Sequence, residues 1–151
     1  RGWLFDDRAA QDRVYRDFTW LSPAHRAAHP VWGSAYGLEP YAVAADVYSQ
    51  PPYAGRGGWS WYTGAAGWMH RAALESLLGL QMTADELWFE PCLPAAWPRA
   101  TLTLRRGGHR LHVVLHRGAG DAADGLAVRV GERIRWRELP ASSRLRVAVD
   151  A

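Results

Sequence analysis

The residues best suited to chemistry lie in one stretch, Gly55 to Met69, where a glycine-rich segment runs into aromatic residues and a Thr-Gly pair. Glycine allows a ligand to come close to the backbone. The start of a helix offers unpaired backbone N–H groups and the positive end of the helix dipole, which favour an anion such as phosphate. Tryptophan side chains add flat apolar surfaces on which sugar rings stack. The stretch therefore predicts a site for phosphate and a sugar.

Four residues of this stretch are candidates for binding phosphate: Arg56, Gly57, Thr63 and Gly64. A guanidinium can bind two phosphate oxygens at once, but Arg56 is equally consistent with a solvated arginine in a loop. Thr63 is also a suitable N-cap, in which case Gly64 only permits close packing. The residues alone leave both interpretations open.

Three further residues are candidates for binding the substrate: Asp46, Trp61 and Tyr62. Asp46 falls near the end of a predicted alanine-rich helix, Leu38 to Tyr48, where the helix dipole disfavours a carboxylate. Hydrogen bonds to sugar hydroxyls would explain its presence there, and so would an ion pair with a nearby arginine.

Several elements must position these residues. Apolar residues at helical spacing predict a helix from Asp7 to Trp20, and Ser22-Pro23 precedes a second short helix over residues 24–28. Residues 30–37 read as a loop. Residues 50–58 hold two adjacent prolines and three glycines, so they predict a loop as well.

The clearest helical pattern extends from Tyr62 to Leu80, and Gly79 is a suitable stop. We expect its apolar surface to be buried, and a helix this apolar belongs in an assembly of several helices. The residues of that surface are Trp68, Met69, Ala72, Ala73, Leu74, Leu77, Leu78 and Leu80. His70 is expected to be a packed or surface histidine.

Residues 101–116 predict a β-hairpin with a two-residue Gly-Gly turn. This turn would pair Leu104 with Leu111 and Leu102 with Val113, so that the apolar side chains share one face. The alternation along the strands leaves the arginines on the solvated face.

A second hairpin is predicted further along the chain. A three-residue loop after Val130 would pair Val130 with Ile134 and Val128 with Trp136, and residues 145–149 would form a last strand. We therefore expect an α+β chain, with residues 1–84 helical and residues 85–151 a small antiparallel, jelly-roll-like sheet domain.

Composition and charge restrict the kinds of ligand that the protein is expected to bind. The net charge is +3, and the eighteen basic residues are all arginine. Arginine is the better bidentate partner for phosphate, although a coding bias explains the absence of lysine more simply. The arginines are spread along the chain, so no nucleic-acid partner is expected. His25 and His29 are four apart but lack a third ligand, so we predict no metal.

The single cysteine excludes an internal disulfide, and we expect Cys92 to be packed and inert. The sequence holds no run of 18 apolar residues and no signal-peptide pattern. Because it begins at Arg1 without a methionine, we expect a fragment of a larger protein. Its expected location is cytoplasmic, with a parent that other segments could anchor to the bacterial inner membrane.

Residues 36 to 98 resemble the C-terminal part of glycoside hydrolase family 94. The motifs that carry the resemblance are Glu39-Pro40-Tyr41, the run from Ala45 to Pro52, the run from Gly55 to Met69, and the run from Leu87 to Pro94 followed by Trp97-Pro98. The family holds cellobiose, chitobiose and related disaccharide phosphorylases. The sequence of these motifs is most similar to one branch of the family, the phosphorylase region of cyclic β-1,2-glucan synthases.

The resemblance implies a fold and an activity. The helices would be the last part of an (α/α)6 barrel, followed by a terminal β-domain. The parent enzyme would cleave a β-glucoside, such as β-1,2-glucan or a β-linked disaccharide, with inorganic phosphate and inversion. Thr63 and Gly64 match the family's phosphate-binding Thr-Gly. No other cofactor is implied, and phosphate is the co-substrate.

Phosphorolysis requires a general acid but no second carboxylate, because phosphate is already an anionic nucleophile. The family's general acid lies upstream, and no segment here matches it, so no catalytic residue is assigned. We therefore expect the fragment to depend on an upstream barrel segment and to be inactive alone. The alternative function is a non-catalytic carbohydrate-binding or scaffolding domain. A glycosidase that uses water is a third option and would release free sugar.

Overall fold

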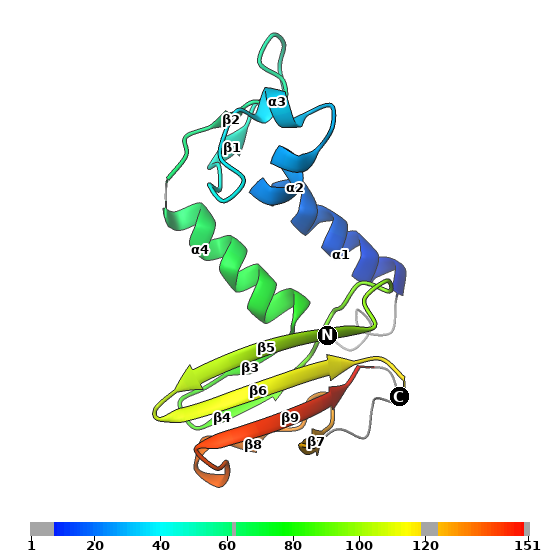
Figure 1. Cartoon of the computed structure of the whole chain (residues 1–151), viewed down its shortest axis with the longest axis vertical. Helices are drawn as coiled ribbons and strands as arrows, with labels where there is room; N and C mark the ends of the chain where they lie inside the picture. The colour runs from blue at the N-terminus through cyan, green and yellow to red at the C-terminus, as the bar shows by residue number, and fades with distance from the viewer. Residues whose placement is uncertain (1–7, 62, 119–123, 150–151) are drawn as a thin grey trace. The chain divides into compact units, whose positions relative to one another are not determined.

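The computed structural model describes residues 8–61, 63–118 and 124–149, and only the backbone of residues 8 and 63. Contacts divide the chain into two compact units. We call Arg13–Ala73 the helical unit, and Arg1–Asp12 with Leu74–Ala151 the sheet unit. Figure 1 shows the helices of the first and the strands of the second. The chain is therefore α+β, as the sequence predicts.

The first helices follow the sequence closely. Helix α1 (Arg8–Leu21) and helix α2 (Pro23–Ala28) confirm the two predicted helices, and proline occupies the first turn of α2. Helix α3 (Gly33–Tyr36) is a single turn within the region predicted as a loop. It ends at Gly37, whose φ of 64° is the left-handed conformation typical of a helix stop.

The helix predicted from Leu38 to Tyr48 is wrong. The backbone turns at Glu39, whose carbonyl accepts a hydrogen bond from the Ala42 N–H at 3.0 Å. Strand β1 (Asp46–Val47) then pairs antiparallel with strand β2 (Gly57–Gly58). Pairing with the glycine strand satisfies backbone groups that a helix would satisfy internally, and it overrides the weak helical preference of an alanine-rich segment.

Helix α4 (Thr63–Arg71) continues as a π-helical stretch, η2 (Ala72–Leu77). The helix therefore ends three residues before the predicted end, and the predicted first residue, Tyr62, lies outside the described residues. Past that end, Gly79 has a left-handed φ of 68°, as expected of a stop. No helix in the described ranges is both long and apolar enough to cross a lipid bilayer.

The burial predicted for this helix is confirmed only in part. Leu77 and Leu80 are buried, whereas the Trp68 side chain is 69% exposed. The guanidinium of Arg71 lies 5.3 Å from the centre of the Trp68 ring, a cation–π contact on the open side of α4. The prediction that Trp68 is buried is therefore wrong for this chain.

The sheet unit holds two sheets, with strand orders β3-β4-β8 and β5-β6-β9-β7. The strands are β3 Leu80–Met82, β4 Glu86–Phe89, β5 Arg99–Arg106, β6 His109–His116, β7 Leu126–Val128, β8 Ile134–Arg135 and β9 Ser142–Ala148. A short 3-10 helix, η3 (Trp136–Glu138), follows β8.

The β5–β6 hairpin confirms the sequence prediction. Leu104 pairs with Leu111 and Leu102 pairs with Val113 in an antiparallel register. The two glycines of the turn have φ angles of 53° and 82°. Two consecutive positive φ angles match the turn type whose twist fits a two-residue hairpin.

The predicted second hairpin is wrong. Val128 pairs with Val147 rather than Trp136, and Ile134 pairs with Leu87 rather than Val130. Strand β9 lies between β6 and β7 and runs parallel to both, whereas the β3-β4-β8 sheet and the β5–β6 pair are antiparallel. These distant pairings bury Val128, Val147 and Leu87, and leave Val130 41% exposed. Burial of apolar area favours them over the local hairpin.

The core of the sheet unit lies between the two sheets. Figure 1 shows β5, β6 and β9 in front of β3, β4 and β8. Both sheets and the segments beside them supply side chains to the core, as expected when each sheet has one apolar face. The core residues are Leu80, Leu87, Phe89, Leu93, Leu111, Val113, Leu115, Val128, Ile134, Trp136, Leu139, Leu145 and Val147.

Candidate phosphate and sugar site

The glycine-rich stretch is fixed in place by the β1–β2 ribbon of the helical unit. Asp46 pairs with Gly58, and Val47 pairs with Gly57. The ribbon extends at both ends through backbone hydrogen bonds, from the Tyr48 N–H to Arg56 O at 2.9 Å and from the Ala45 N–H to Trp59 O at 3.0 Å. Residues predicted as a free loop are thus partly held by a two-stranded pairing.

Gly57 has a packing reason to be glycine. A Cβ at this position would lie 2.5 Å from Leu38 Cδ1 and 3.0 Å from Tyr36 Cε2. The Tyr36 ring is itself buried, and its hydroxyl donates a hydrogen bond to Ala42 O at 3.3 Å. The backbone of Gly57 therefore packs tightly on one side, and its proposed role toward phosphate stays a prediction.

Asp46 lies across Gly58. A Cβ added to Gly58 would meet Asp46 Oδ1 at 2.5 Å, so glycine leaves the space that this carboxylate occupies. Asp46 belongs to a strand, so the helix-dipole argument for its role does not apply. Its side chain is exposed, and within the described ranges no arginine forms an ion pair with it. Its role toward sugar hydroxyls stays a prediction.

An open cleft of about 610 Å³ lies beside the ribbon. It is lined by Tyr48, Tyr53, Arg56, Gly57, Gly58 and Trp59. The Arg56 guanidinium lies 5.8 Å from the centre of the Tyr53 ring, and the Tyr48 and Tyr53 rings are 6.4 Å apart. The cleft thus offers one cation and several aromatic faces, which suits an anionic or hydroxylated ligand.

Two tryptophans beside the cleft are held in an uncommon backbone conformation. Trp59 and Trp61 have φ angles of 37° and 66°. A bulky residue at positive φ costs on the order of 1–3 kcal/mol, and such strain clusters at binding sites. Their side chains are 65% and 68% exposed, and the centres of the Trp61 and Tyr41 rings are 6.1 Å apart in an edge-to-face arrangement.

The start of α4 is open at Gly64. A Cβ added there would meet nothing within 4 Å, and Gly64 is exposed. The sequence-based hypothesis would have failed if Gly57, Thr63 and Gly64 were all sealed beneath other side chains. Gly57 is buried and Gly64 is open, so the three residues are not all sealed, and the role of the site stays a prediction. The Thr63 side chain and the whole of Tyr62 lie outside the described residues, so their predicted roles stay predictions.

The structure brings together only part of the predicted set. Arg56 and Gly57 line the cleft, whereas Asp46, Trp61 and Gly64 are not among its lining residues. Tyr48 and Tyr53 also line the cleft, although the sequence pattern does not single them out as site residues. These two tyrosines flank the Ser-Gln-Pro-Pro segment, and that position was the only signal that could have singled them out.

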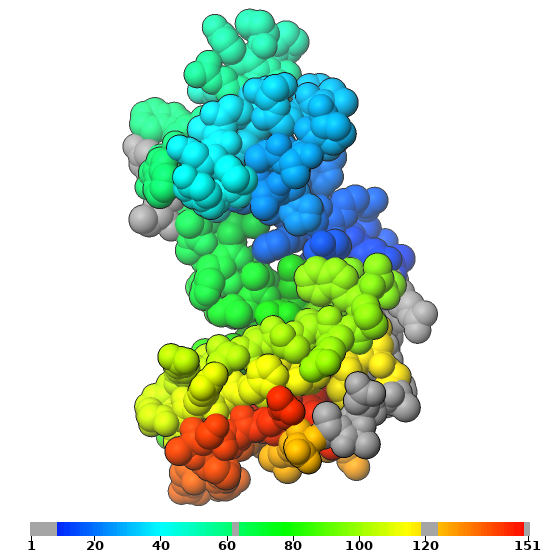
Figure 2. All heavy atoms as spheres, viewed as in Figure 1, coloured from blue at the N-terminus to red at the C-terminus, as the bar shows by residue number. Residues whose placement is uncertain are grey.

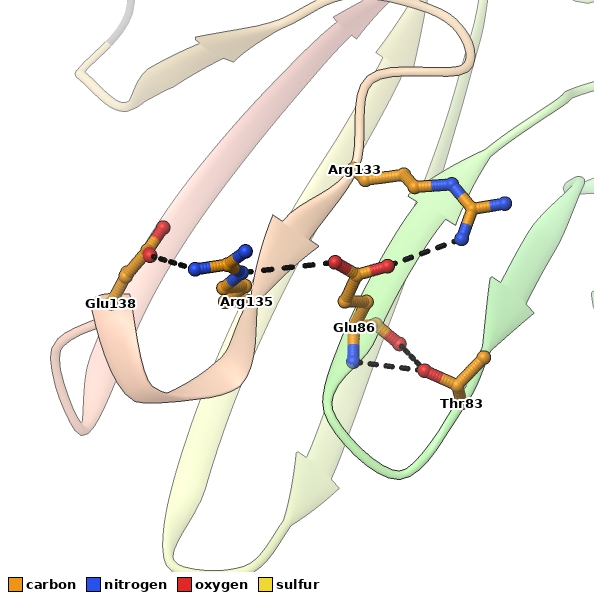
Figure 3. Close-up of polar contacts among 5 residues, drawn as sticks. All are labelled: Thr83, Glu86, Arg133, Arg135 and Glu138. Atoms are coloured by element: carbon orange, nitrogen blue, oxygen red, sulfur yellow. Dashed lines mark hydrogen bonds and ion pairs between the residues drawn. The ribbon is translucent and has the colours of Figure 1, made fainter.

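Glu86, in the sheet unit, forms ion pairs with two arginines (Figure 3). Arg133 Nη1 donates to Glu86 Oε2 at 3.1 Å, and Arg135 Nε lies 3.8 Å from Glu86 Oε1. Arg135 Nη1 also lies 3.8 Å from Glu138 Oε1. Both carboxylate oxygens of Glu86 therefore face guanidiniums, and its role is to link β4 and β8 at the surface of the sheet.

The two histidines that the sequence raises as metal ligands have local partners. His25 Nδ1 lies 3.0 Å from Ser22 Oγ. His29 Nδ1 accepts hydrogen bonds from the N–H groups of Val31 at 3.2 Å and Trp32 at 3.1 Å. Across the described ranges no three His, Cys, Asp or Glu side chains gather as metal ligands would.

Cys92 is buried in the sheet unit, as predicted. Burial raises the pKa of its thiol above the ordinary value, and the nearby positive charge of Arg117 opposes that rise. A thiol with a raised pKa carries little thiolate at neutral pH, which makes it a poor nucleophile. The Cys92 thiol therefore contributes packing rather than nucleophilic chemistry.

Family models match two consecutive parts of the chain. Residues 9–79 match the model described as "Glycosyl hydrolase 94 superfamily, catalytic domain". Residues 80–119 match the model described as "Glycosyl hydrolase family 65, C-terminal domain". The first match contains every predicted site residue.

Curated relatives of the chain include a glucan synthase and two phosphorylases. Over 116 residues, 74% of this chain and 4% of the relative, the chain is 43% identical to the "Cyclic beta-(1,2)-glucan synthase NdvB" of Rhizobium meliloti (strain 1021). It is 38% identical over 68 residues, 44% of this chain and 9% of the relative, to the "Solabiose phosphorylase" of Paenibacillus borealis. It is 33% identical over 76 residues, 50% of this chain and 10% of the relative, to the "N,N'-diacetylchitobiose phosphorylase" of Vibrio furnissii.

The chain spans a tenth or less of the length of these relatives. The cleft, the glycine ribbon and the start of α4 all fall inside the matched catalytic segment. Residues 9–79 of this chain thus match the glycoside hydrolase 94 superfamily catalytic domain, and the match to the family 65 C-terminal domain begins directly after them.

Proposed function

We propose that this chain is the C-terminal part of an inverting glycoside phosphorylase. The parent enzyme would cleave a β-glucoside, either β-1,2-glucan or a β-linked disaccharide, with inorganic phosphate to give a sugar 1-phosphate. The observation that carries the proposal is the open start of α4 at Gly64, inside a segment that matches the family 94 catalytic domain. Relatives named as phosphorylases of solabiose and of chitobiose support the same reaction class.

In this reaction a phosphate oxygen bonds to the anomeric carbon while the bond from that carbon to the leaving oxygen breaks. A general acid gives the leaving oxygen its proton. Phosphate arrives as an anion, so the protein has to hold and orient it, and such positioning lowers the barrier by reducing the entropy lost on reaction. We assign this role to Thr63 and to the backbone N–H groups that begin α4, with the charge of Arg56 as a further attraction.

The sugar would lie against the exposed aromatic residues of the helical unit. Trp61 and Tyr62 are the predicted contacts, and the cleft adds Tyr48 and Tyr53. Asp46, exposed beside Gly58, would accept hydrogen bonds from sugar hydroxyls. The general acid and the rest of an (α/α)6 barrel would come from an upstream segment of the same polypeptide, so the chain alone would be inactive. We place the reaction in the cytoplasm, with phosphate as co-substrate and no other cofactor.

The test uses the full-length protein that contains this chain. Thr63→Val removes the hydroxyl and keeps the shape, whereas Thr63→Ser keeps the hydroxyl and serves as the control. We expect phosphate-dependent release of sugar 1-phosphate to fall roughly 100-fold or more in Thr63→Val, as when one preorganised donor is lost. The control should keep most of the activity. Equal phosphate dependence in both variants would refute the assignment of Thr63.

The exposed Trp59 and Trp61 side chains favour a second candidate, a non-catalytic carbohydrate-binding domain. That function predicts that the 151-residue chain binds a β-glucan with equal affinity with or without phosphate. It also predicts that the full-length protein releases no sugar 1-phosphate. Release of free sugar instead would identify a glycosidase that uses water.

A further inference from the structure

The outer face of the four-stranded sheet carries positive charge with no negative charge on its three long strands. Strands β5, β6 and β9 contain neither aspartate nor glutamate. The register puts five arginines on the face opposite the core: Arg99, Arg105, Arg110, Arg144 and Arg146. Figure 2 shows β5, β6 and β9 as adjacent yellow-green, yellow and red bands on the side facing the viewer. Arg99, Arg105, Arg110 and Arg144 are exposed on this face, whereas Arg146 is half-buried.

The register also brings like charges together. Arg105 is directly opposite Arg110 across the β5–β6 pair. Residues opposite one another in a sheet have Cβ atoms roughly 5 Å apart, and like charges at that spacing destabilise the pair. An anion bound between them would remove this repulsion.

Two arginines elsewhere in the same unit form ion pairs. Arg133 and Arg135 share the Glu86 carboxylate at 3.1 and 3.8 Å. Arg110 and Arg144, by contrast, have no ion pair or side-chain hydrogen bond within residues 8–61, 63–118 and 124–149. The difference is one of placement, because carboxylates are present beside β8 and absent from β5, β6 and β9.

This face is also hollowed. A shallow cleft of about 460 Å³ is lined by Arg110, His112, Ser142, Ser143 and Arg144. The Ser143 hydroxyl is already used, since it donates to Pro140 O at 3.0 Å. His112 Nδ1 lies 3.5 Å from Thr103 Oγ1, so one ring nitrogen has a neighbour on the sheet. The two guanidiniums and the Ser142 hydroxyl remain as donors over the hollow.

We propose that this hollow is a binding site for a phosphoryl group, separate from the site in the helical unit. Paired guanidiniums match the geometry of phosphate oxygens, and a serine hydroxyl adds a neutral donor. The phosphoryl group comes either from a soluble sugar phosphate or from the headgroup of an anionic lipid. Both sources present the same chemistry to Arg110 and Arg144.

The experiment is done on the 151-residue chain in a Thr63→Val background, so that the proposed phosphate site in the helical unit does not contribute. Calorimetry measures binding of inorganic phosphate and of a hexose 1-phosphate, and sedimentation measures binding to vesicles of phosphatidylcholine with phosphatidylglycerol. The test variant is Arg110→Gln/Arg144→Gln. The control is Arg129→Gln/Arg137→Gln, which removes the same charge from exposed arginines away from this cleft.

We expect the test variant to weaken binding roughly tenfold or more and the control to change it less than about twofold, because only the test variant loses charge-assisted hydrogen bonds. Without added anion, the test variant should also melt at the same or a higher temperature, since the repulsion is gone. Binding to phosphate or sugar phosphate alone identifies a soluble ligand, and binding to vesicles alone identifies a lipid. Equal weakening in both variants, or no binding in any arm, overturns the proposal.

Discussion

Gly64→Ala should separate phosphate binding from stability. Gly64 is the second residue of α4, and a Cβ added there would meet nothing within 4 Å. Alanine is favoured over glycine within a helix by about 0.5–1 kcal/mol. The variant should therefore be equally stable or up to about 1 kcal/mol more stable, because the methyl group displaces no atom of the chain.

The same methyl group would stand where phosphate approaches the backbone of α4. In the full-length enzyme we expect the KM for phosphate to rise at least about tenfold, which corresponds to about 1.4 kcal/mol of lost binding. The KM for the glycoside should change little. A variant that gains stability and loses phosphate affinity cannot be explained by misfolding.

Gly67→Ala is the matched control. Gly67 lies one turn further along α4, and a Cβ there would also meet nothing within 4 Å. Its stability should rise by a similar or larger amount, because it lies inside the helix. Phosphate kinetics should be unchanged. Urea denaturation of the 151-residue chain gives the stabilities, and initial rates of the full-length protein give the kinetics.

Two results would refute this reasoning. If Gly64→Ala keeps its phosphate KM, the anion does not bind against the first turn of α4. If Gly67→Ala destabilises the isolated chain, other atoms pack against α4 at Gly67, which contradicts the open space around this residue.

Three further predictions concern the sheet unit. Gly79→Ala should cost about 3 kcal/mol or more in urea denaturation, because φ is 68° and the new Cβ would lie 2.1 Å from the Glu90 carbonyl carbon; a loss below about 1 kcal/mol would show that the backbone moves freely there. Glu86→Gln should cost about 0.5–1 kcal/mol, less in high salt, because it breaks two partly exposed ion pairs; an effect that does not depend on salt would contradict this origin. The raised pKa of Cys92 means that the unfolded chain loses the thiol proton first as pH rises above 9.0, so the free energy of unfolding should fall there by an amount that Cys92→Ala abolishes. Equal slopes in the wild type and Cys92→Ala would contradict it.

Local signals in the sequence predicted the local parts of the fold. The β5–β6 hairpin was found because its turn and its alternating apolar residues are neighbours in sequence. Helix α1 was predicted because its apolar residues recur at helical spacing within one short segment. Strands β3 and β4 were missed because they have three and four residues, too few for a period to show, whereas the strand at Ile134 was predicted with the wrong partner.

Pairing between distant segments explains the remaining errors. The segment from Leu38 to Tyr48 looks helical from its composition, but two of its residues pair with glycines ten or more positions away. Val130 looked like a strand partner of Ile134, yet Ile134 pairs with Leu87. Such pairings depend on which apolar surfaces meet in the folded chain, and a single sequence carries no local signal for them.

The residues of the site also divide into those that a local sequence pattern predicts and those that it does not. Arg56 and Gly57 were predicted because glycines around a lone arginine mark a binding loop, and both line the cleft. Tyr48 and Tyr53 carry no spacing signal. They approach one another only because the Gly55 N–H donates to Tyr48 O and the Arg56 N–H donates to Tyr53 O, at 2.8 and 3.0 Å.

The position of β9 has a consequence for how the chain reaches its native state. Among the described residues, strand β7 pairs only with β9, and β6 keeps one open edge until β9 is in place. A ribosome therefore has to release residues 142–148 before the sheet can close, and until then the unpaired backbone edge of β6 is available to other chains. Premature termination before Ser142 would leave an aggregation-prone product rather than a smaller domain.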